Sequence, residues 1–171
     1  LQKSELKWEK MANLSNIKIK LLNKDIASII ISESKTYNAL SFKNLVDLIK
    51  AFKKIDNDRN IKVIIIEGAG KGFSAGHNLK EVSGLRKKAK YQKLFNLCSK
   101  LMLQIVEGKK PVIAKVHGAA FAAGCQLVAS CDLAYATKDA LFATPGVNIG
   151  LFCSTPMVAV SRKVNRKRMM K

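Results

Sequence analysis

The pattern of hydrophobic and polar positions divides the chain into short strands that alternate with helices. Apolar residues alternate with lysines over residues 17–22 and recur over 27–31, so these segments are predicted to pair as a hairpin around the turn at 23–25. Residues 61–66 and 111–116 are almost uninterrupted apolar runs, which are typical of buried parallel strands. Two further short strands are expected at 133–136 and 141–143.

Helical spacing of apolar residues predicts the elements between these strands. Ser41 is a good N-cap for a helix whose apolar positions continue to Ile55. Shorter helices are expected over residues 125–130 and from Thr155 onward. A long helix over about 87–107 carries an apolar stripe that is interpreted as core and not as a cofactor groove: Tyr91, Leu94, Phe95, Cys98, Leu101, Met102 and Ile105. The alternation predicts an α/β fold of βαβ units, stacked along one spiral or sheet.

Length and composition narrow the class of protein. A chain of 171 residues with 48% hydrophobic content is long enough for one domain with a normal core. No apolar run reaches the roughly 18 residues of a membrane span, and residues 1–20 lack the apolar core of a signal peptide, so the cytoplasm is the expected location and no membrane partner is expected. Four cysteines without a C-x-x-C pair, and only two histidines, predict packed, reduced thiols and no metal site.

The net charge of +19 is strong enough to attract nucleic acid, anionic lipid or a polyphosphate ligand. The lysines are nevertheless spread through the chain, with local concentrations only at 86–93 and 162–171, and three tyrosines and one tryptophan offer few rings for base stacking. A solvated, lysine-rich surface is therefore the preferred interpretation, without a nucleic-acid partner. A basic nucleic-acid-binding module is the alternative from another class of function.

Two stretches of small residues are the candidate ligand sites. Residues 68–76 (GAGKGFSAG) follow a predicted strand, where α/β sheets place ligands. The G-x-G-x-x-A match is weak because no long helix begins at Ala75, and a Walker A loop is excluded because Lys71 is followed by glycine. Residues 118–124 precede a short helix whose free N–H groups suit an oxyanion. Tight packing of glycine and alanine explains the same composition without a ligand, and both interpretations stay open.

Three motifs together resemble one family. GKGFSAGHNLKE (residues 70–81), the segment KPVIAKVHGAAFAAGCQLVASCDLAYATKDALFATPGVNIG (110–150) and the earlier KTYNAL (35–40) are similar to signature regions of the crotonase, or enoyl-CoA hydratase/isomerase, superfamily. Within it, GCQLVASCDLAYA and ATPGVNIGLFCSTP are most similar to the subgroup of enoyl-CoA hydratase domain-containing protein 3. The resemblance implies a spiral of ββα units that binds an acyl-CoA thioester in fatty-acid metabolism, with no cofactor besides coenzyme A as part of the substrate.

The resemblance also implies roles for particular residues. The thioester oxygen would lie between the backbone N–H groups of His77 and Ala123, where preorganised donors stabilise an enolate. The coenzyme A moiety would contact five residues, of which the last is the best candidate for a phosphate contact: Lys35, Tyr37, Ala39, Ala75 and Lys80.

The chain departs from its family at the two catalytic glutamates. Their positions fall at Gln126 and Gly146, and neither residue can accept a proton near neutral pH. The proton would then come from water held by Gln126 or from the imidazole of His77. The acyl-pocket segment 151–156 also differs from typical hydratases, and Asp132 is expected to be structural. A hydratase/isomerase-like enzyme is the first interpretation, and an inactive acyl-CoA binder of the same fold is the second.

The ends of the chain suggest a piece of a longer protein. Residues 1–16 are interpreted as an extension, and residues 17–171 as a C-terminally incomplete core. Members of the family form trimers, often paired into hexamers, through a C-terminal helical segment. That segment is expected to be missing beyond Lys171.

Overall fold

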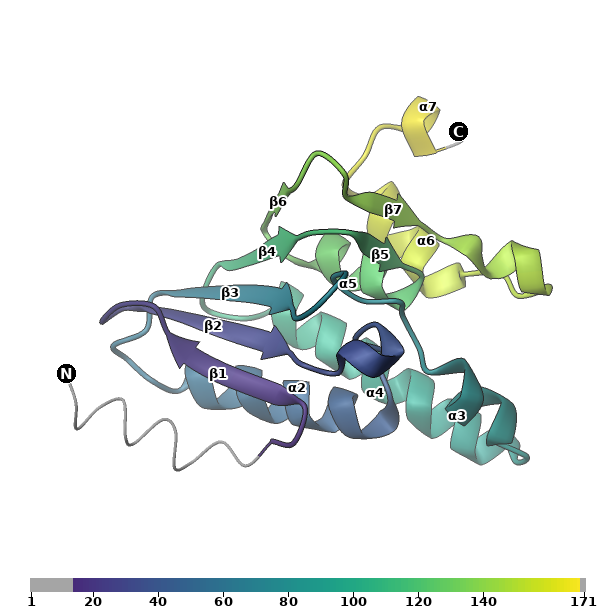
Figure 1. Cartoon of the computed structure of the whole chain (residues 1–171), viewed down its shortest axis with the longest axis horizontal. Helices are drawn as coiled ribbons and strands as arrows, with labels where there is room; N and C mark the ends of the chain where they lie inside the picture. Colours follow the sequence, from purple (N-terminus) through teal and green to yellow (C-terminus); the bar gives the residue numbers. More distant parts are fainter. Residues whose placement is uncertain (1–13, 170–171) are drawn as a thin grey trace.

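The N-terminal hairpin is the first folded element of the computed structural model, which describes residues 14–169 (Figure 1). Strand β1 (Ile17–Leu21) pairs antiparallel with β2 (Ile26–Ile31). The side chain of Asn23 accepts hydrogen bonds from the backbone N–H of Ile26 at 2.9 Å and of Asp25 at 3.0 Å, which fixes the turn. The predicted hairpin is therefore confirmed.

Parallel strands extend this hairpin into the main sheet, in the order β1-β2-β3-β4-β6. The strands after β2 all run parallel to it. A second, two-stranded parallel sheet lies beside the first and contains β5 and β7. The added strands are β3 (Val63–Gly68), β4 (Val112–Val116), β5 (Ala119–Phe121), β6 (Leu133–Ala136) and β7 (Leu141–Ala143).

The chain winds as a spiral, because each turn repeats a strand of the main sheet, a shorter extended segment and a helix. In the early turns the shorter segment makes only isolated parallel bridges: Leu40 pairs with His77, and Ser74 pairs with Ala120. In the later turns the shorter segments are the strands β5 and β7, which pair with each other. The helices are the 3-10 helix η1 (Ser34–Thr36), α2 (Phe42–Asp56), α3 (Leu79–Gly84), α4 (Lys88–Val106), α5 (Ala123–Ser130), the 3-10 helix η2 (Pro145–Ile149), α6 (Ser154–Ser161) and α7 (Arg166–Met169).

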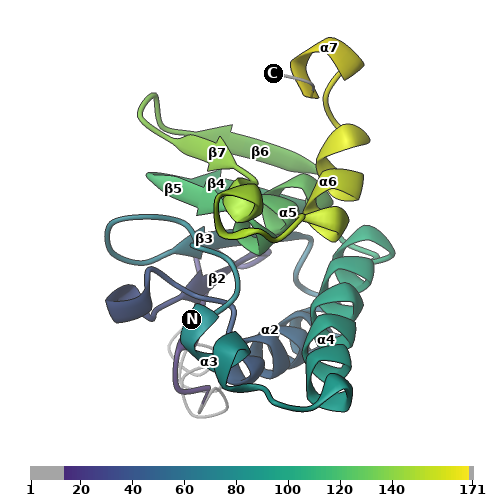
Figure 2. The same cartoon turned by 90° about the vertical axis from the view of Figure 1, so that its right-hand side faces the viewer.

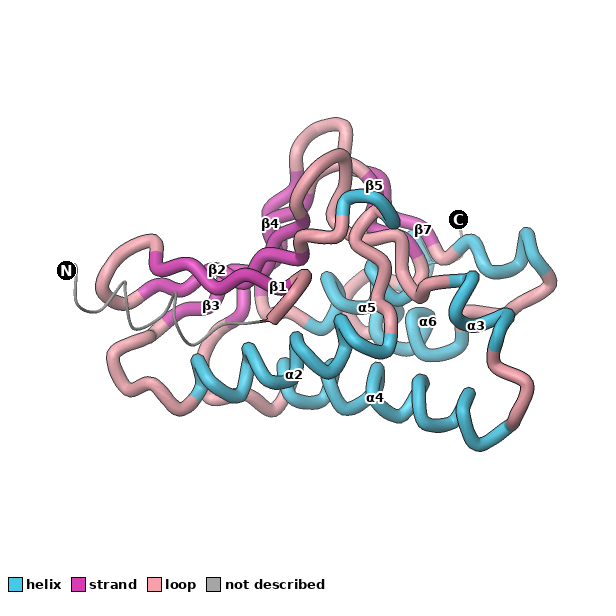
Figure 3. Tube along the Cα trace, turned by 60° about the horizontal axis from the view of Figure 1, so that its bottom comes forward, coloured by secondary structure: helices cyan, strands magenta, loops and turns pink. Residues whose placement is uncertain are grey.

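Helices α2 and α4 run side by side and cover one face of the sheet (Figures 1 and 3). The hydroxyl of Ser41 caps α2 by accepting from the Asn44 N–H at 3.2 Å, as its sequence predicts. Most of the apolar stripe of α4 is core, but Phe95 is 40% exposed, so the interpretation of the whole stripe as core is wrong at this residue. Burial raises the pKa of the Cys98 and Cys131 thiols to about 12, in keeping with packed, unreactive cysteines.

The last turns of the spiral differ from the first because their strands are not covered. All residues of β6 are exposed, with Leu133 at 54% and Tyr135 at 67%. On β7, Leu141 is 61% and Phe142 is 47% exposed. The strands themselves were predicted from their apolar character, which usually accompanies burial. Here it accompanies an open apolar surface instead.

Asn38 anchors the glycine-rich loop that follows β3. Its side chain is fully buried and its φ of 56° lies in the left-handed region, which asparagine tolerates. The side-chain amide donates to the carbonyls of Ala69 at 2.7 Å and Gly72 at 2.8 Å. The side-chain oxygen accepts from the Glu33 N–H at 2.9 Å. One side chain therefore satisfies three backbone groups and fixes where the loop begins.

No helix within residues 14–169 is long and apolar enough to cross a membrane. The predicted extension at residues 1–16 lies largely outside the described residues. Its boundary with the core stays a prediction. Two of its last residues contact the folded core: Leu14 packs against the hydrophobic core, and the Asn16 carbonyl accepts from the Ser32 N–H at 2.7 Å.

Replacing Asn38 by alanine tests this anchor. The variant leaves buried loop groups without partners and puts alanine, which tolerates a positive φ less well than asparagine, at this position. We therefore expect the free energy of unfolding in urea to fall by about 2–4 kcal/mol. Asn60→Ala is the matched control, because Asn60 is exposed and its side chain donates to Asp58, two residues away. Equal effects of the two substitutions would contradict the anchoring role.

Candidate active site

The loop of residues 74–77 lies directly against the N-terminus of α5. The Ser74 N–H donates to the Ala119 carbonyl at 3.0 Å, and the Phe121 N–H donates to the Ser74 carbonyl at 2.9 Å. A Cβ on Gly76, whose φ is +87°, would lie 2.9 Å from the Phe121 oxygen and 3.1 Å from the Ala123 nitrogen. Only glycine therefore permits this approach, which brings the residue before His77 against the Ala123 amide.

A strained residue positions that amide. Ala122 has φ 49° and ψ −119°, a conformation that alanine rarely adopts, and its N–H donates to the Ala143 carbonyl of β7 at 2.8 Å. Helix α5 begins immediately afterwards, at Ala123, two residues before the predicted start. Among the backbone hydrogen bonds that residues 14–169 make outside helices and strands, none has the N–H of His77 or Ala123 as its donor.

Both residues line one cavity of about 600 Å³, and so do three of the other residues singled out from the sequence: Ala75, Gln126 and Gly146. The cavity lies between the loop, α3, α4, α5 and the segment from η2 to α6. Helices α5 and α6, which form part of its wall, pack side by side (Figure 2). Its large apolar lining residues are Leu79, Phe95, Ile149, Leu151, Phe152 and Pro156.

The remaining residues assigned to coenzyme A lie outside this lining. Tyr37 is 55% exposed and its carbonyl accepts from the Ala75 N–H at 2.9 Å, so its backbone adjoins the cavity mouth. Ala39 is buried, whereas the side chains of Lys35 and Lys80 are exposed. Lys80 is in the first turn of α3. Of the five residues expected to contact coenzyme A, the structure thus places Ala75 in the cavity wall and buries Ala39, while Lys35, Tyr37 and Lys80 are exposed outside the lining.

The two positions that the family resemblance assigns to catalytic glutamates, Gln126 and Gly146, both line the cavity. Gln126 is only 5% exposed, and its side-chain oxygen accepts from the Thr155 hydroxyl at 3.1 Å. Gly146 is buried, and a Cβ there would lie 2.3 Å from the Leu151 carbonyl oxygen and 2.6 Å from the Cys153 sulfur. A carboxylate at residue 146 therefore requires movement of the following backbone.

The imidazole of His77 is held by two contacts. Its Nδ1 is 3.3 Å from the Leu40 carbonyl oxygen, and its ring meets that of Phe95 edge-on at 5.3 Å. Because a carbonyl only accepts, Nδ1 carries the hydrogen and Nε2 is the free acceptor. Burial lowers the pKa of His77 below its ordinary value, while the Leu40 hydrogen bond and the charge of Glu81 oppose that shift. The geometry favours a neutral imidazole at the cavity wall.

Sequence reasoning missed Phe95 as a residue of the cavity wall, whereas Cys153 and Thr155 belong to the segment 151–156 that the resemblance assigns to the acyl pocket. Phe95 follows the spacing of a core stripe, and nothing in that spacing separates it from its buried neighbours. The hydrogen bond that Thr155 makes was not expected. Its partner Gln126 precedes it by 29 residues, so their contact depends on how α5 and α6 pack. The other histidine, His117, lies outside this cavity, and its Nε2 is 2.8 Å from the Gly70 carbonyl oxygen.

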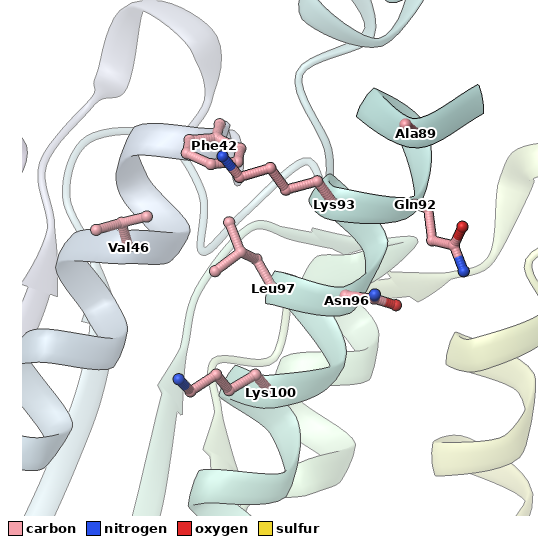
Figure 4. Close-up of a pocket in the computed structure, with 8 residues that line it drawn as sticks. All are labelled: Phe42, Val46, Ala89, Gln92, Lys93, Asn96, Leu97 and Lys100. Carbon is pink, nitrogen blue, oxygen red and sulfur yellow. The ribbon is translucent and has the colours of Figure 1, made fainter. Parts of the chain in front are cut away.

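A second hollow of about 570 Å³ lies between α2 and α4 (Figure 4). Phe42, Val46 and Leu97 form its apolar part, and the ammonium of Lys93 lies 5.2 Å from the centre of the Phe42 ring. Its described lining contains no carboxylate, thiol or imidazole, and its ionisable groups are the exposed Lys93 and Lys100. Within residues 14–169, no cluster of three metal-ligating side chains occurs either.

Comparison with known proteins identifies relatives of this site and fold. The chain is 49% identical over 142 residues to human "Enoyl-CoA hydratase domain-containing protein 3, mitochondrial", a match covering 83% of the chain and 47% of that protein. The Xenopus laevis protein of the same name is 50% identical over 142 residues, with 83% and 48% covered. The chain thus spans about half the length of these curated relatives. Their names call them mitochondrial, which differs from the cytoplasm expected for this chain.

Solved structures agree with the predicted architecture. The human domain-containing protein 3 superposes with a TM-score of 0.86 at 44% identity, covering 91% of this chain and 61% of that one. An enoyl-CoA hydratase of Mycobacterium smegmatis gives a TM-score of 0.87 at 44% identity, with 91% and 60% covered. The expected crotonase spiral and the likeness to this subgroup are confirmed. Since the family model "Enoyl-CoA hydratase/isomerase" also matches residues 22–171, the chain belongs to the enoyl-CoA hydratase/isomerase family.

Proposed function

We propose that the chain binds an acyl-CoA thioester, as a protein of fatty-acid metabolism, and stabilises the enolate of that thioester. The observation that carries this proposal is the approach of Gly76 to the Ala123 amide at the wall of a largely apolar cavity. The N–H groups of His77 and Ala123 would both donate to the thioester oxygen. Ala123 is the first residue of α5, so the positive end of the helix dipole adds to the attraction for negative charge.

Proton transfer would differ from the two-glutamate chemistry of hydratases. Gln126 cannot take up a proton, whereas the neutral imidazole of His77 has an acceptor nitrogen free of the Leu40 contact. His77, or a water held by Gln126, would therefore move the proton at the carbon next to the thioester. The lack of any carboxylate at 126 and 146 equally favours the second candidate, an acyl-CoA binder without turnover.

Coenzyme A would lie along the exposed edge beside Tyr37 and Ala75, with Lys35 and Lys80 available for its phosphates. These lysines are exposed, which suits a phosphate contact that must also release its ligand. No cofactor besides the coenzyme A of the substrate enters this proposal. The cytoplasm stays the predicted location, and the mitochondrion named for the relatives is the alternative.

Replacing Ala123 by proline tests the oxyanion assignment. Proline suits the first position of a helix, and its ring carbon takes the place of the N–H hydrogen, so the donor is lost and the space in front of it is filled. We expect exchange of the α-protons of butyryl-CoA in D₂O, followed by NMR, to slow by about 10²–10³-fold. Ala122→Gly is the matched control, since glycine accepts its φ of 49° and both donors remain. Full exchange in Ala123→Pro would overturn the assignment, and binding without exchange in the unmodified chain would favour the inactive binder.

The protonation state of His77 is testable by itself. Because burial lowers its pKa, one of the two imidazole signals in an NMR titration should have its midpoint below about 6.5, and His77→Gln should remove that signal. The depressed pKa stabilises the fold above the unfolded-state value, and this contribution is lost as the pH falls through the folded-state pKa. A midpoint at or above the ordinary value would exclude a neutral imidazole as the base near pH 6.5.

We also propose that the chain assembles with further copies, as a trimer or a pair of trimers. The supporting observation is the uncovered apolar surface of β6, β7 and the segment after them. Beyond Leu133, Tyr135, Leu141 and Phe142 it includes residues that are at least half exposed: Val147, Ile149, Leu151 and Phe152. Monomeric proteins rarely leave so many large apolar side chains of one region in water.

Sedimentation of single-residue variants tests this assembly. Phe142→Glu places a charge in the uncovered surface, so we expect a loss of trimer and a shift toward monomer. Leu22→Glu is the matched control, because Leu22 is 49% exposed against 47% for Phe142 but lies at the hairpin turn. If both variants sediment as the unmodified chain does, β7 is not at the interface.

A further inference from the structure

One thiol lies in the wall of the acyl cavity. Cys153 lines the cavity and is half-buried, whereas the other three cysteines of the chain, Cys98, Cys125 and Cys131, are buried and are not part of the lining. Burial raises the pKa of each of these three thiols, so they stay protonated and unreactive. Cys153 is therefore the one thiol that a ligand in the cavity can meet, and the proposed mechanism leaves it unused.

The sulfur of Cys153 lies beside a position that the family resemblance assigns to catalysis. A Cβ on Gly146 would lie 2.6 Å from this sulfur, so the sulfur is found where a side chain of residue 146 would begin. The resemblance gives that position to one of the two glutamates with which hydratases add water to an enoyl thioester. In this chain the reactive atom at that place is a thiol sulfur and not a carboxylate oxygen.

Other groups of the same cavity wall suit the addition of a thiol. The imidazole of His77 has Nδ1 turned to the Leu40 carbonyl, so Nε2 is free to accept the thiol proton. The N–H groups of His77 and Ala123 are the donors for the thioester oxygen, and this step rests on the proposed function. Cys153 directly precedes α6, whose N-terminal end favours negative charge nearby. A nucleophile, a base and an oxyanion site thus share one cavity.

Two hydroxyl groups also belong to the lining, those of Ser154 and Thr155. The Thr155 hydroxyl is engaged, since it donates to the Gln126 side-chain oxygen at 3.1 Å. A hydroxyl is also a much weaker nucleophile than a thiol near neutral pH, because a thiol is partly ionised there and its sulfur is intrinsically more nucleophilic. Cys153 is therefore the favoured nucleophile of this wall.

We infer that Cys153 adds covalently to an α,β-unsaturated acyl-CoA, a 2-enoyl thioester, bound in the cavity. The thiol proton passes to Nε2 of His77, and the sulfur electron pair forms a bond to C3. The C2=C3 π pair moves between C1 and C2, and the carbonyl π pair moves to the thioester oxygen, where the two N–H groups stabilise it. The imidazolium then returns the proton to C2. The product is a thioether that retains coenzyme A, formed without an oxidant or any further reactant.

Intact-mass spectrometry of the chain after incubation with crotonyl-CoA tests this addition. We expect one adduct per chain with the mass of the whole crotonyl-CoA, located at Cys153 by peptide sequencing, and none with butyryl-CoA, which lacks the double bond. An adduct that carries only the acyl group would show thioester exchange and overturn the inference. Binding of crotonyl-CoA without an adduct, measured by isothermal titration, would also overturn it. Failure of both thioesters to bind would refute the proposed function as well.

Three variants separate this addition from unspecific labelling. Cys153→Ser should abolish the adduct while butyryl-CoA still binds, which shows that the cavity is intact. Cys98→Ala is the matched control, because Cys98 is buried in α4, and it should keep the adduct. His77→Gln keeps both backbone donors but removes the proton acceptor, so adduct formation should slow by about 10²-fold or more. An adduct that persists in Cys153→Ser, or forms equally fast in His77→Gln, would contradict the inference.

Discussion

The close approach of the residue 74–77 loop to the N-terminus of α5 is the constraint on which the site depends. A side chain at Gly76 would collide with the Phe121 oxygen, and a Cβ at Gly124 would lie 2.3 Å from the Ser74 oxygen. Glycine at both positions lets two backbone segments touch that are almost fifty residues apart. The anchor at Asn38 and the strained bend at Ala122 serve the same contact, because each fixes one of the two segments.

The cavity wall includes His77 and Ala123, whose backbone N–H groups are the proposed donors, but no carboxylate among its described residues, which limits the chemistry that the proposed site can support. Backbone N–H groups are held by the fold itself, so they persist when neighbouring side chains change. A glutamate cannot simply replace Gly146 in this backbone, since a Cβ there would lie 2.3 Å from the Leu151 carbonyl oxygen. Gln126 has the size of a glutamate, and its side-chain oxygen accepts from the Thr155 hydroxyl.

Much of the fold could be predicted from local pattern, because strands and helices differ in their apolar period. The cap at Ser41, the hairpin turn at Asn23 and the order of strands and helices all follow from neighbouring residues. The convergence of His77 with Ala123 could not be derived from composition, and it entered through the family resemblance. Three features required the coordinates: Phe95 at the cavity wall, the Gln126 to Thr155 contact, and the exposure of β6 and β7. Each depends on how distant elements pack, which no local pattern records.

The most direct measurement of the central claim is the carbonyl stretching frequency of a bound acyl-CoA that carries ¹³C at the thioester carbon. Two converging N–H donors polarise the carbonyl, so the infrared difference spectrum should show this band at lower frequency in the complex than in water. The Ala123→Pro variant should return the band most of the way to its free position. A band that stays at its solution frequency on binding would contradict the proposal that these two amides share one oxygen.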